Sequence, residues 1–534
     1  MKPAKLRTTQ FQRALSTFLA ASMILTGNLP MRSYAGGPVI IPETVQNTYD
    51  GNSNLTHRTD ANGAGTVYNY DALNRLVSID YPGGASPDVS FVYDENGNRT
   101  SMTDWNGTTF YAYDYYDRLT GIDYPDGGFV LYDYDDVGNV TTLIYGTYQA
   151  LILQGVCTYI QYTYDPDNRI SSVANAFTGD VTTYTYDAAG NVSRRTLPNG
   201  AYTTYAYDGD GRMTNVVHRK VDGTLICGYG YTLNAIGNRT SMIETTNTTI
   251  RTTSYTYDPL DRLASATYPN GRWVQYQYDS FGNRTNLIET TNGIAHVRAY
   301  TYDTDSRLLS TKFDGAAEET FTYDNTGNLI QRFRSTDNRL INYAYDTENR
   351  LVRYFSGTNN VQYIYNGAGN RVAKIVNGVR MNYVNDPNRQ YIQVLAETDS
   401  SGTPQRVYEW GNELINQETG TGANRYYYLQ DAKKGSVRRL IDVGGAVVNN
   451  YEYDAFGTPI LKAESVHNDY KFQGEIEEAE TGLVFLRARH MDPDTGRFLT
   501  RDHLRGITKN PKSLHSYVYA SGDPINAHDA SECV

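Results

Sequence analysis

Two short motifs alternate along most of this 534-residue chain. Residues 70–76 read YDALNRL, and residues 93–99 read YDENGNR. The first form, which we call the Arg-Leu form although Ile or Met can replace the Leu, recurs at Tyr113, Tyr164, Tyr207, Tyr257, Tyr302 and Tyr345. The Gly-Asn form recurs at Tyr134, Tyr186, Leu233, Tyr278, Tyr323 and Tyr365. These fourteen units, mostly 20 to 24 residues apart, predict one repetitive architecture in place of three or four ordinary domains.

Each unit has the local chemistry of a β-hairpin. The residues before the Asp alternate, as in the YNY of 68–70, which places aromatic rings on one face of a strand. The Asp carboxylate can accept a backbone hydrogen bond two residues on, and pairs such as Gly97-Asn98 tolerate positive φ. A second turn signal, such as the YPNG of 268–271, falls about eleven residues after several motif tyrosines. The sequence therefore predicts a continuous antiparallel ribbon of stacked hairpins.

The composition indicates a folded, acidic protein. Aromatic residues make up 13% of the chain, including 49 Tyr, whereas disordered chains are poor in them. The formal net charge is −12, and without residues 1–35 the remaining 42 Lys and Arg against 59 Asp and Glu give −17. This charge argues against binding to nucleic acid.

Residues 1–35 are predicted to be a secretory signal peptide. Basic residues come first, an apolar stretch follows at 14–25, and Ser33-Tyr34-Ala35 supplies small residues at the cleavage site. The alternatives are a buried helix or a membrane anchor, but polar residues interrupt this stretch and it is short for a bilayer. We therefore expect a secreted or cell-surface protein without a membrane span in the mature chain.

The two motifs, at a spacing of about 21 residues, resemble the YD motifs of RHS (rearrangement hotspot) proteins, teneurins and the shell components of insecticidal toxin complexes. The resemblance covers roughly residues 50–380. It implies an all-β fold in which repetitive antiparallel β-hairpins form a spiral β-sheet that closes into a hollow YD shell. The domain organisation expected from it is a lead-in segment at 36–65 and a YD-repeat β-shell at 66–380.

From about Met381 the spacing changes, and residues 425–529 resemble the RHS-repeat-associated core. The matching stretches are RYYYL at 425–429, YDAFG at 453–457 and DPDTGRF at 492–498. We expect residues 381–534 to form this core as a hairpin-rich C-terminal plug. The alternation from Leu483 to Arg489 predicts one half-buried strand, followed by a turn at 492–496 and a returning strand.

In many family members an aspartate-dependent self-cleavage beyond the core releases a variable C-terminal polypeptide, often a toxin. The candidate residues here are Arg501, Asp502 and Asp529, because paired carboxylates can act as acid and base in peptide hydrolysis. This chain departs from the family pattern, since His503 stands where Pro is usual and residues 503–522 contain no acidic residue. Only a few residues follow Asp529, so we expect an uncut chain and interpret Arg501 and Asp502 as a structural ion pair.

The repeat residues are expected to set turns and packing. They are represented by Tyr70, Asp71, Arg75, Tyr93, Asp94, Gly97, Asn98, Tyr257, Asp258, Arg262, Tyr278, Asp279, Gly282 and Asn283. No cofactor or metal is expected, because calcium loops need several oxygen ligands within a dozen residues and no His or Cys pair has zinc spacing. Cys157, Cys227 and Cys533 are too few for a disulfide framework, although a bridge between the first two is left open.

Three functions remain open. The first is an exported bacterial shell without enzymatic activity, acting as a scaffold or enclosing a polypeptide. The second is a cell-surface adhesin for carbohydrate or protein, since aromatic rings beside carboxylates suit sugar recognition. The third is an autoproteolytic toxin-shell precursor. Tyrosines that face inward around an empty cavity favour the first function, and an exposed aromatic patch on the outside favours the second.

Overall fold

The structure is a computed structural model that describes residues 45–83, 88–155, 157–419, 424–433, 435–502 and 514–528. The predicted signal peptide, Asp529 and Cys533 lie outside these residues. All described residues belong to one unit, Pro42–Val534. None of the helices in this described part is long and apolar enough to cross a bilayer.

Antiparallel strands dominate the protein, which confirms the predicted all-β class. The main sheet has 38 strands, and each strand pairs antiparallel with the next strand in sequence. The strands before helix α2 (Tyr148–Gln154) are β1 Gln46–Tyr49, β2 Leu55–Thr59, β3 Gly65–Tyr70, β4 Leu76–Asp80, β5 Val89–Tyr93, β6 Arg99–Asp104, β7 Gly107–Tyr113, β8 Leu119–Asp123, β9 Gly128–Tyr134 and β10 Val140–Thr147.

The strands after α2 continue the same ribbon without a crossover. They are β11 Thr158–Tyr164, β12 Ile170–Asn175, β13 Val181–Tyr186, β14 Val192–Thr196, β15 Tyr202–Tyr207, β16 Met213–Arg219, β17 Leu225–Leu233, β18 Arg239–Thr245, β19 Ile250–Tyr257, β20 Leu263–Thr267, β21 Trp273–Tyr278, β22 Arg284–Thr291, β23 Ile294–Tyr302, β24 Leu308–Phe313, β25 Ala316–Tyr323, β26 Leu329–Arg334, β27 Arg339–Tyr345, β28 Leu351–Ser356, β29 Asn359–Tyr365, β30 Arg371–Val376, β31 Val379–Asp386, β32 Gln393–Asp399, β33 Pro404–Trp410, β34 Leu414–Thr419, β35 Asn424–Gln430, β36 Val437–Asp442, β37 Val447–Tyr453 and β38 Pro459–Glu464. Strands before and after position 380 belong to this one sheet, so the proposed division into a shell and a core at that position stays a prediction.

The motif aspartate closes one turn of each hairpin, which we call the Tyr-Asp turn, and Asn234 and Asn366 take its place in two units. Asp71 Oδ1 accepts the backbone N–H of Arg75 at 2.9 Å, and Asp71 Oδ2 accepts Arg75 Nε at 2.7 Å. In the Gly-Asn form, Asp94 accepts the backbone N–H of Asn98 at 2.8 Å and its side-chain amide at 3.1 Å. The two forms therefore build the same turn. The same contacts recur at Asp258 with Arg262 and at Asp279 with Asn283.

The third residue after the motif aspartate has a positive φ in both forms. Gly97 has φ 93° and Gly282 has φ 94°, as the Gly-Asn form predicts. Asn74 has φ 61°, so the Arg-Leu form needs the same backbone conformation. A short polar side chain tolerates this left-handed region better than most residues do, and the sequence pattern alone does not reveal that requirement.

The motif tyrosine joins each hairpin to the one before it. Tyr93 Oη donates to the Leu76 carbonyl oxygen at 2.8 Å, and Tyr278 Oη donates to the Leu263 carbonyl oxygen at 2.9 Å. Arg75 also lies over the Tyr93 ring, 4.8 Å from its centroid. Each unit is therefore bonded to its neighbour by residues of the motif itself, as stacking of repeats requires.

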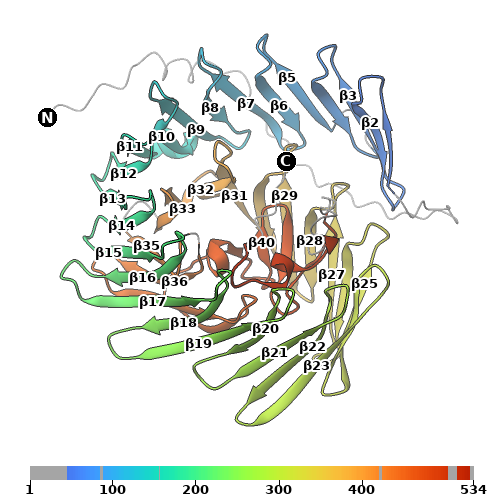
Figure 1. Cartoon of the computed structure of the whole chain (residues 1–534). Helices are drawn as coiled ribbons and strands as arrows, with labels where there is room; N and C mark the ends of the chain where they lie inside the picture. The colour runs from blue at the N-terminus through green and yellow to red at the C-terminus, as the bar shows by residue number, and fades with distance from the viewer. Residues whose placement is uncertain are drawn as a thin grey trace. The chain divides into compact units, whose positions relative to one another are not determined.

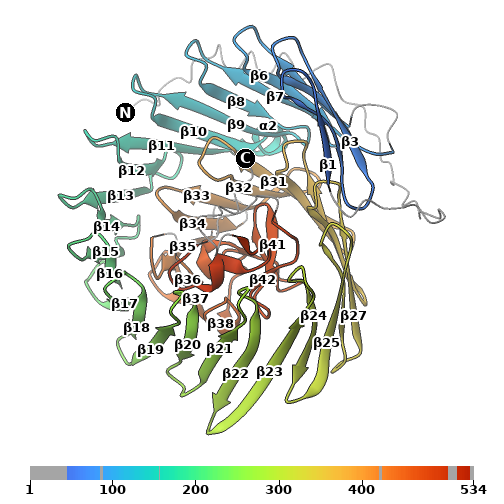
Figure 2. The same cartoon turned by 45° about the vertical axis from the view of Figure 1, so that its right-hand side comes forward.

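The sheet curves back on itself as a spiral (Figure 1). Tyr124 Oη donates at 2.7 Å to the carbonyl oxygen of Asn385, 261 residues later. Farther along, the N–H of Ala455 donates at 2.9 Å to the hydroxyl of Tyr268, only 187 residues earlier. The number of residues between contacting partners thus falls along the sheet, as in a spiral that narrows. Strands β31–β38, which we call the inner layer, lie inside strands β9–β21, which we call the outer layer (Figure 2). The predicted spiral sheet is thus confirmed.

The residues after β38 lie inside the curve of the main sheet, and we call residues 465–502 with 514–528 the plug. It holds a four-stranded sheet of β39 Ile476–Glu477, β40 Val484–Leu486, β41 Arg489–Asp492 and β42 Arg497–Phe498, with the short helices η2 Phe472–Gly474 and η4 Tyr519–Gly522. The single strand predicted from Leu483 to Arg489 is wrong. Arg487 takes a left-handed conformation, φ 63°, and the chain reverses there between β40 and β41.

Candidate functional site: the enclosed interior

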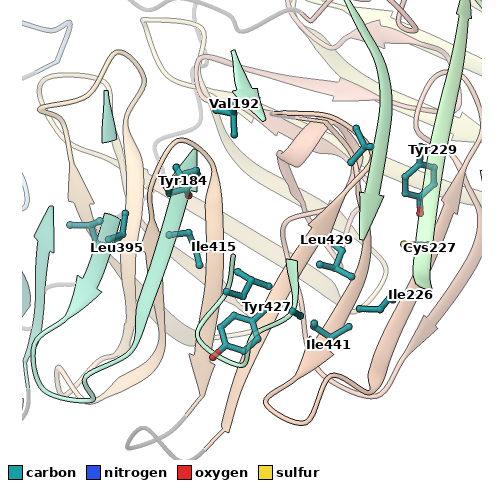
Figure 3. Close-up of a cluster of buried hydrophobic side chains, with 14 of the residues drawn as sticks. Tyr184, Val192, Ile226, Cys227, Tyr229, Leu395, Ile415, Tyr427, Leu429 and Ile441 are labelled. Atoms are coloured by element: carbon teal, nitrogen blue, oxygen red, sulfur yellow. The ribbon is translucent and has the colours of Figure 1, made fainter. Parts of the chain in front are cut away.

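An aromatic stripe covers the inner face of the repeats. In all fourteen units an aromatic residue stands two positions before the motif tyrosine or Leu233. Eleven of these residues are buried, namely Phe91, Tyr132, Tyr162, Tyr184, Tyr231, Tyr255, Tyr276, Tyr300, Phe321, Tyr343 and Tyr363. Figure 3 shows Tyr184 of the outer layer beside Ile415 of the inner layer. Burial of the stripe against the inner layer and the plug makes it structural packing.

The seam between the outer and inner layers contains buried charges that sequence reasoning missed. Arg195, 0% exposed, donates to Glu413 Oε1 at 2.8 Å and to the Tyr428 carbonyl oxygen at 2.9 Å. Farther along the seam Arg439 pairs with Glu244 at 2.8 Å. Both pairs join a residue of the outer layer to one of the inner layer, and a buried ion pair stabilises a fold only where hydrogen bonds offset its desolvation.

A buried histidine also joins the two layers. His218 Nε2 lies 2.9 Å from the Gln430 carbonyl oxygen, which can only accept, so Nε2 carries the proton. His218 Nδ1 then accepts the Thr203 hydroxyl at 2.8 Å. Burial, together with nearby Arg195, lowers the pKa of His218 to about 3. This histidine is therefore neutral at physiological pH.

The plug is attached to the main sheet by another charged group. Glu478, with a fully buried side chain, contacts Arg371 and lies 3.1 Å from Lys374 Nζ. Burial alone would raise the pKa of Glu478, but the two cations hold it at about 2. His490 lies close to this group, and burial lowers its pKa to about 3. The plug thus carries a permanent negative charge where it meets β30.

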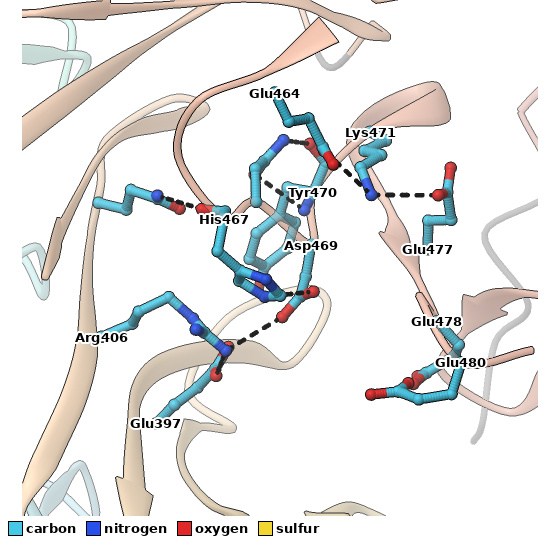
Figure 4. A network of polar contacts seen from close by, with 12 residues as sticks. Glu397, Arg406, Glu464, His467, Asp469, Tyr470, Lys471, Glu477, Glu478 and Glu480 are labelled. Carbon is cyan, nitrogen blue, oxygen red and sulfur yellow. Dashed lines mark hydrogen bonds and ion pairs between the residues drawn. The ribbon is translucent and has the colours of Figure 1, made fainter. Parts of the chain in front are cut away.

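A polar network fixes the first residues of the plug (Figure 4). Asp469 lies 2.9 Å from His467 Nε2 and 3.4 Å from a guanidinium nitrogen of Arg406 on β33. Lys471, 1% exposed, lies 3.1 Å from Glu477. These contacts tie the start of the plug to the inner layer.

The structure places the candidate cleavage residues as follows. Asp502 Oδ2 lies 2.8 Å from a guanidinium nitrogen of Arg489, and the N–H of Asp502 donates to the Ser516 carbonyl oxygen at 3.0 Å. Arg501 is exposed, and Asp529 lies outside the described residues. Asp502 is thus paired with Arg489 on β41, a contact that fits a structural role. The assignment of these three residues to self-cleavage stays a prediction.

Asp492, a buried carboxyl group whose pKa is raised, was not identified from the sequence. Asp492 is buried and accepts from Arg332 Nη1 at 3.2 Å and from the Thr495 hydroxyl at 3.0 Å. Burial raises the pKa of Asp492 to about 6. Asp492 ends β41, and its bond to Arg332 makes it a contact between the plug and β26.

Neither metal ligands nor disulfides stand out in the described ranges. Within them, no three His, Cys, Asp or Glu side chains come together as a metal site. Cys157 and Cys227, for which a bridge was left open, are both free thiols. Asn98 and Asn283 each begin an Asn-x-Thr glycosylation sequon. Both use their side-chain amides inside the Tyr-Asp turns, so the repeat explains these sequons.

Repeats that interlock through their motif residues, and a sheet that spirals around its own C-terminal segment, define this protein as a repeat-built β-shell. The Teneurin YD-shell family model matches residues 220–525, and the RHS Repeat model matches 49–86, 93–128, 164–201 and 186–225. The chain belongs to the Teneurin YD-shell family, which confirms the resemblance inferred from the motifs.

Relatives match over short stretches. The tRNA(Glu)-specific nuclease WapA of Bacillus subtilis subsp. natto is 30% identical over 147 residues, which is 27% of this chain and 6% of the relative. Salivary gland surface protein 1 of Aedes aegypti is 33% identical over 109 residues, 20% of this chain and 3% of the relative. The matched parts span less than a tenth of either relative.

The fold is similar to that of a larger solved structure. In the crystal structure of TcdB2-TccC3-Cdc42, the likeness covers 91% of this chain and 31% of that chain, with a TM-score of 0.54 and 16% identity. TcdB2-TccC3-TEV gives the same values. At this identity the likeness shows the fold alone.

Proposed function

We propose that this protein is an exported bacterial shell without enzymatic activity that encloses a polypeptide. The observation that carries the proposal is that the sheet curves back on itself as a spiral, with a plug inside the curve. The aromatic stripe is buried, so its rings are not available to a ligand outside the shell, which disfavours adhesion through the stripe. A relative named as a tRNA nuclease fits an enclosed polypeptide that is toxic. Export through residues 1–35 is part of the proposal.

Protease protection tests enclosure directly. An unstructured extension with one protease site is fused after residue 534, and its cleavage rate is compared with that of the same extension as a free peptide. We expect the fused site to be cut at least about tenfold more slowly, because cleavage then follows the rare opening of the shell. Equal rates would contradict enclosure. A Glu478→Leu variant, which removes the plug's anion beside Arg371, is expected to restore fast cleavage.

A second candidate function, a surface adhesin, is favoured by one observation. Apolar or aromatic residues occupy the tips of several Tyr-Asp turns and are exposed, among them Tyr115 at 93%, Tyr116 at 73% and Phe281 at 77%. Exposed rings can stack on the apolar faces of sugars or anchor a protein partner. Binding to a glycan array that is lost in Tyr115→Ser/Tyr116→Ser, and kept in Thr240→Ser, would support adhesion. A blank array with the native protein would remove carbohydrate as the ligand.

A further inference from the structure

The main sheet has two end strands, and they lie in different places. β1 is at the outer end of the spiral, whereas β38 is at its inner end, beside β37 (Figure 2). Within the described ranges β38 pairs with β37 alone, and all six of its residues are exposed. One edge of β38 is therefore open, and an unpaired edge is a template for the addition of a further strand.

The backbone groups that face this open edge follow from the register of β37 and β38. The N–H of Ser465 donates to the Val448 carbonyl oxygen at 3.3 Å, and the register is regular over residues 461–464. Backbone groups alternate in direction along a strand. Those of Lys462 and Glu464 therefore point away from β37, and they direct two N–H groups and two carbonyl oxygens at the open edge.

The features that protect many edge strands do not close this one. Such strands often carry lysine or proline, and β38 contains both. Lys462 Nζ lies 2.9 Å from Glu477 Oε1 of the plug and 3.7 Å from Glu464 Oε2, so its charge is compensated and turned toward the plug. Pro459 is the first residue of β38 and leaves the rest of the edge free.

The position of the edge selects its occupant. The chemistry of the edge would allow a second copy of the chain, because antiparallel pairing about Ala463 places Lys462 opposite Glu464. A second copy, however, brings its own outer layer with it, and β38 lies inside the outer layer of its own chain (Figure 2). A single extended segment that is already inside the shell meets no such obstacle.

The side chains of β38 define the segment that fits. On the face turned away from the plug, Leu461 is 37% exposed and Ala463 is also exposed. A strand with β-branched residues at alternate positions covers that face. Uncharged residues between them lie beside Lys462 and leave its pairing with Glu477 undisturbed.

We propose that the open edge of β38 binds an extended, uncharged strand of the polypeptide held inside the shell. The backbone N–H and carbonyl groups of Lys462 and Glu464 bond to the added strand, as in strand addition at other sheet edges. The proposal deepens the proposed function and rests on it, because the enclosed polypeptide supplies the strand.

Hydrogen exchange at the edge tests the proposal. A Gly-Ser linker of about 30 residues and the segment Thr-Val-Thr-Val-Thr-Val-Thr are fused after residue 534, which gives the segment a high effective concentration. A control fusion has Pro in place of the central Val and cannot extend the sheet. We expect the amides of Lys462 and Glu464 to exchange at least about tenfold more slowly in the first fusion than in the control. Equal rates in the two fusions would overturn the proposal.

Lys462→Pro separates binding from folding. The variant removes an N–H that points away from β37, and edge strands tolerate proline at such a position. Lys462→Ala is the matched control, because it also loses the ion pair with Glu477 but keeps the N–H. We expect the two variants to unfold at the same temperature, with the protection of Glu464 lost only in Lys462→Pro. Protection of Glu464 that survives in Lys462→Pro would overturn the proposal.

The remaining outcomes distinguish this proposal from enclosure and from self-association. Slower exchange that rises with protein concentration in both fusions would assign the edge to a second copy and overturn the proposal. If the protease site is protected but exchange at the edge is unchanged, enclosure stands and strand addition fails. If exchange slows while the protease site is cut freely, strand addition stands and enclosure fails.

Discussion

The Tyr-Asp turns and the seam both pair an arginine with a carboxylate, yet the pairs differ in reach and burial. In the turn, Arg75 contacts Asp71 four residues earlier, and the side chains are 27% and 24% exposed. In the seam, Arg195 contacts Glu413 218 residues later, and the side chains are 1% and 2% exposed. Exposed pairs contribute little to stability, whereas breaking a buried pair is costly. The turn pairs therefore act within a single hairpin, whereas the seam pairs hold the outer and inner layers together.

Arg195→Met tests this contrast with the largest expected effect. The variant leaves Glu413 buried without its cation, so we expect the free energy of unfolding to fall by about 3–5 kcal/mol. Arg194→Met is the matched control, because Arg194 is exposed and lies over the Tyr202 ring. The free energy of unfolding of the control should fall by less than about 1 kcal/mol. Denaturant unfolding measures both variants. Similar losses of unfolding free energy would contradict the larger contribution of the buried pair in the seam.

As the pH falls, the contacts of the buried histidines in the seam and the plug should lose stability before the contacts of the Tyr-Asp turns do. A histidine with a depressed folded-state pKa is protonated more readily in the unfolded chain, so its stability contribution is present above pH 6.5 and is lost as the pH falls toward 3. His218 and His490 both have a pKa of about 3 in the folded protein. We expect each of these two histidines to lower the free energy of unfolding by about 2 kcal/mol at pH 5 relative to pH 7.5.

Unfolding temperatures measured at the two pH values check this expectation. The double variant His218→Gln/His490→Gln should show a smaller drop on acidification than the parent. His296→Gln is the control, because the side chain of His296 on β23 is 44% exposed and pairs with Asp314, outside the seam and the plug. A drop of the same size in the double variant would assign the acid sensitivity to other groups.

Tyr278→Phe probes the bond between neighbouring repeats and has the smallest expected effect. The variant loses the hydrogen bond to the Leu263 carbonyl oxygen, and we expect a loss of about 1 kcal/mol. Hydrogen exchange should speed up in β20–β22 and not in distant hairpins, because repeat contacts join nearest neighbours. Tyr116→Phe, at an exposed turn tip, should change neither quantity. Faster exchange throughout the sheet would show that the repeats do not respond locally.

The repeats could be predicted because their contacts recur at short spacing. Asp71 and Arg75 lie four residues apart, and Tyr93 bonds to Leu76 17 residues earlier. The pattern of the sequence therefore contains both partners of each contact. The positive φ of Asn74 was missed because Asn, unlike Gly, is common in other conformations.

The seam and the plug could not be predicted in the same way. Arg194 and Arg195 are adjacent and chemically identical, yet one is exposed and the other is buried against residues more than 200 positions away. For the candidate cleavage residues, the sequence suggested Arg501 as the partner of Asp502, while the structure pairs Asp502 with Arg489. Only the reversal at Arg487, which no local pattern marks, brings Arg489 there.

The shrinking separation along the seam, from 261 to 187 residues, has a consequence for biosynthesis. Translation runs from the N-terminus, so the outer strands leave the ribosome first, and their seam partners follow about 10 to 50 seconds later at typical rates. Until then the side of the outer layer that will pack against Ile415 and Tyr427 stays uncovered. A nascent chain of this design therefore needs protection from aggregation for that interval, and chaperone dependence should end when β37 has been synthesised.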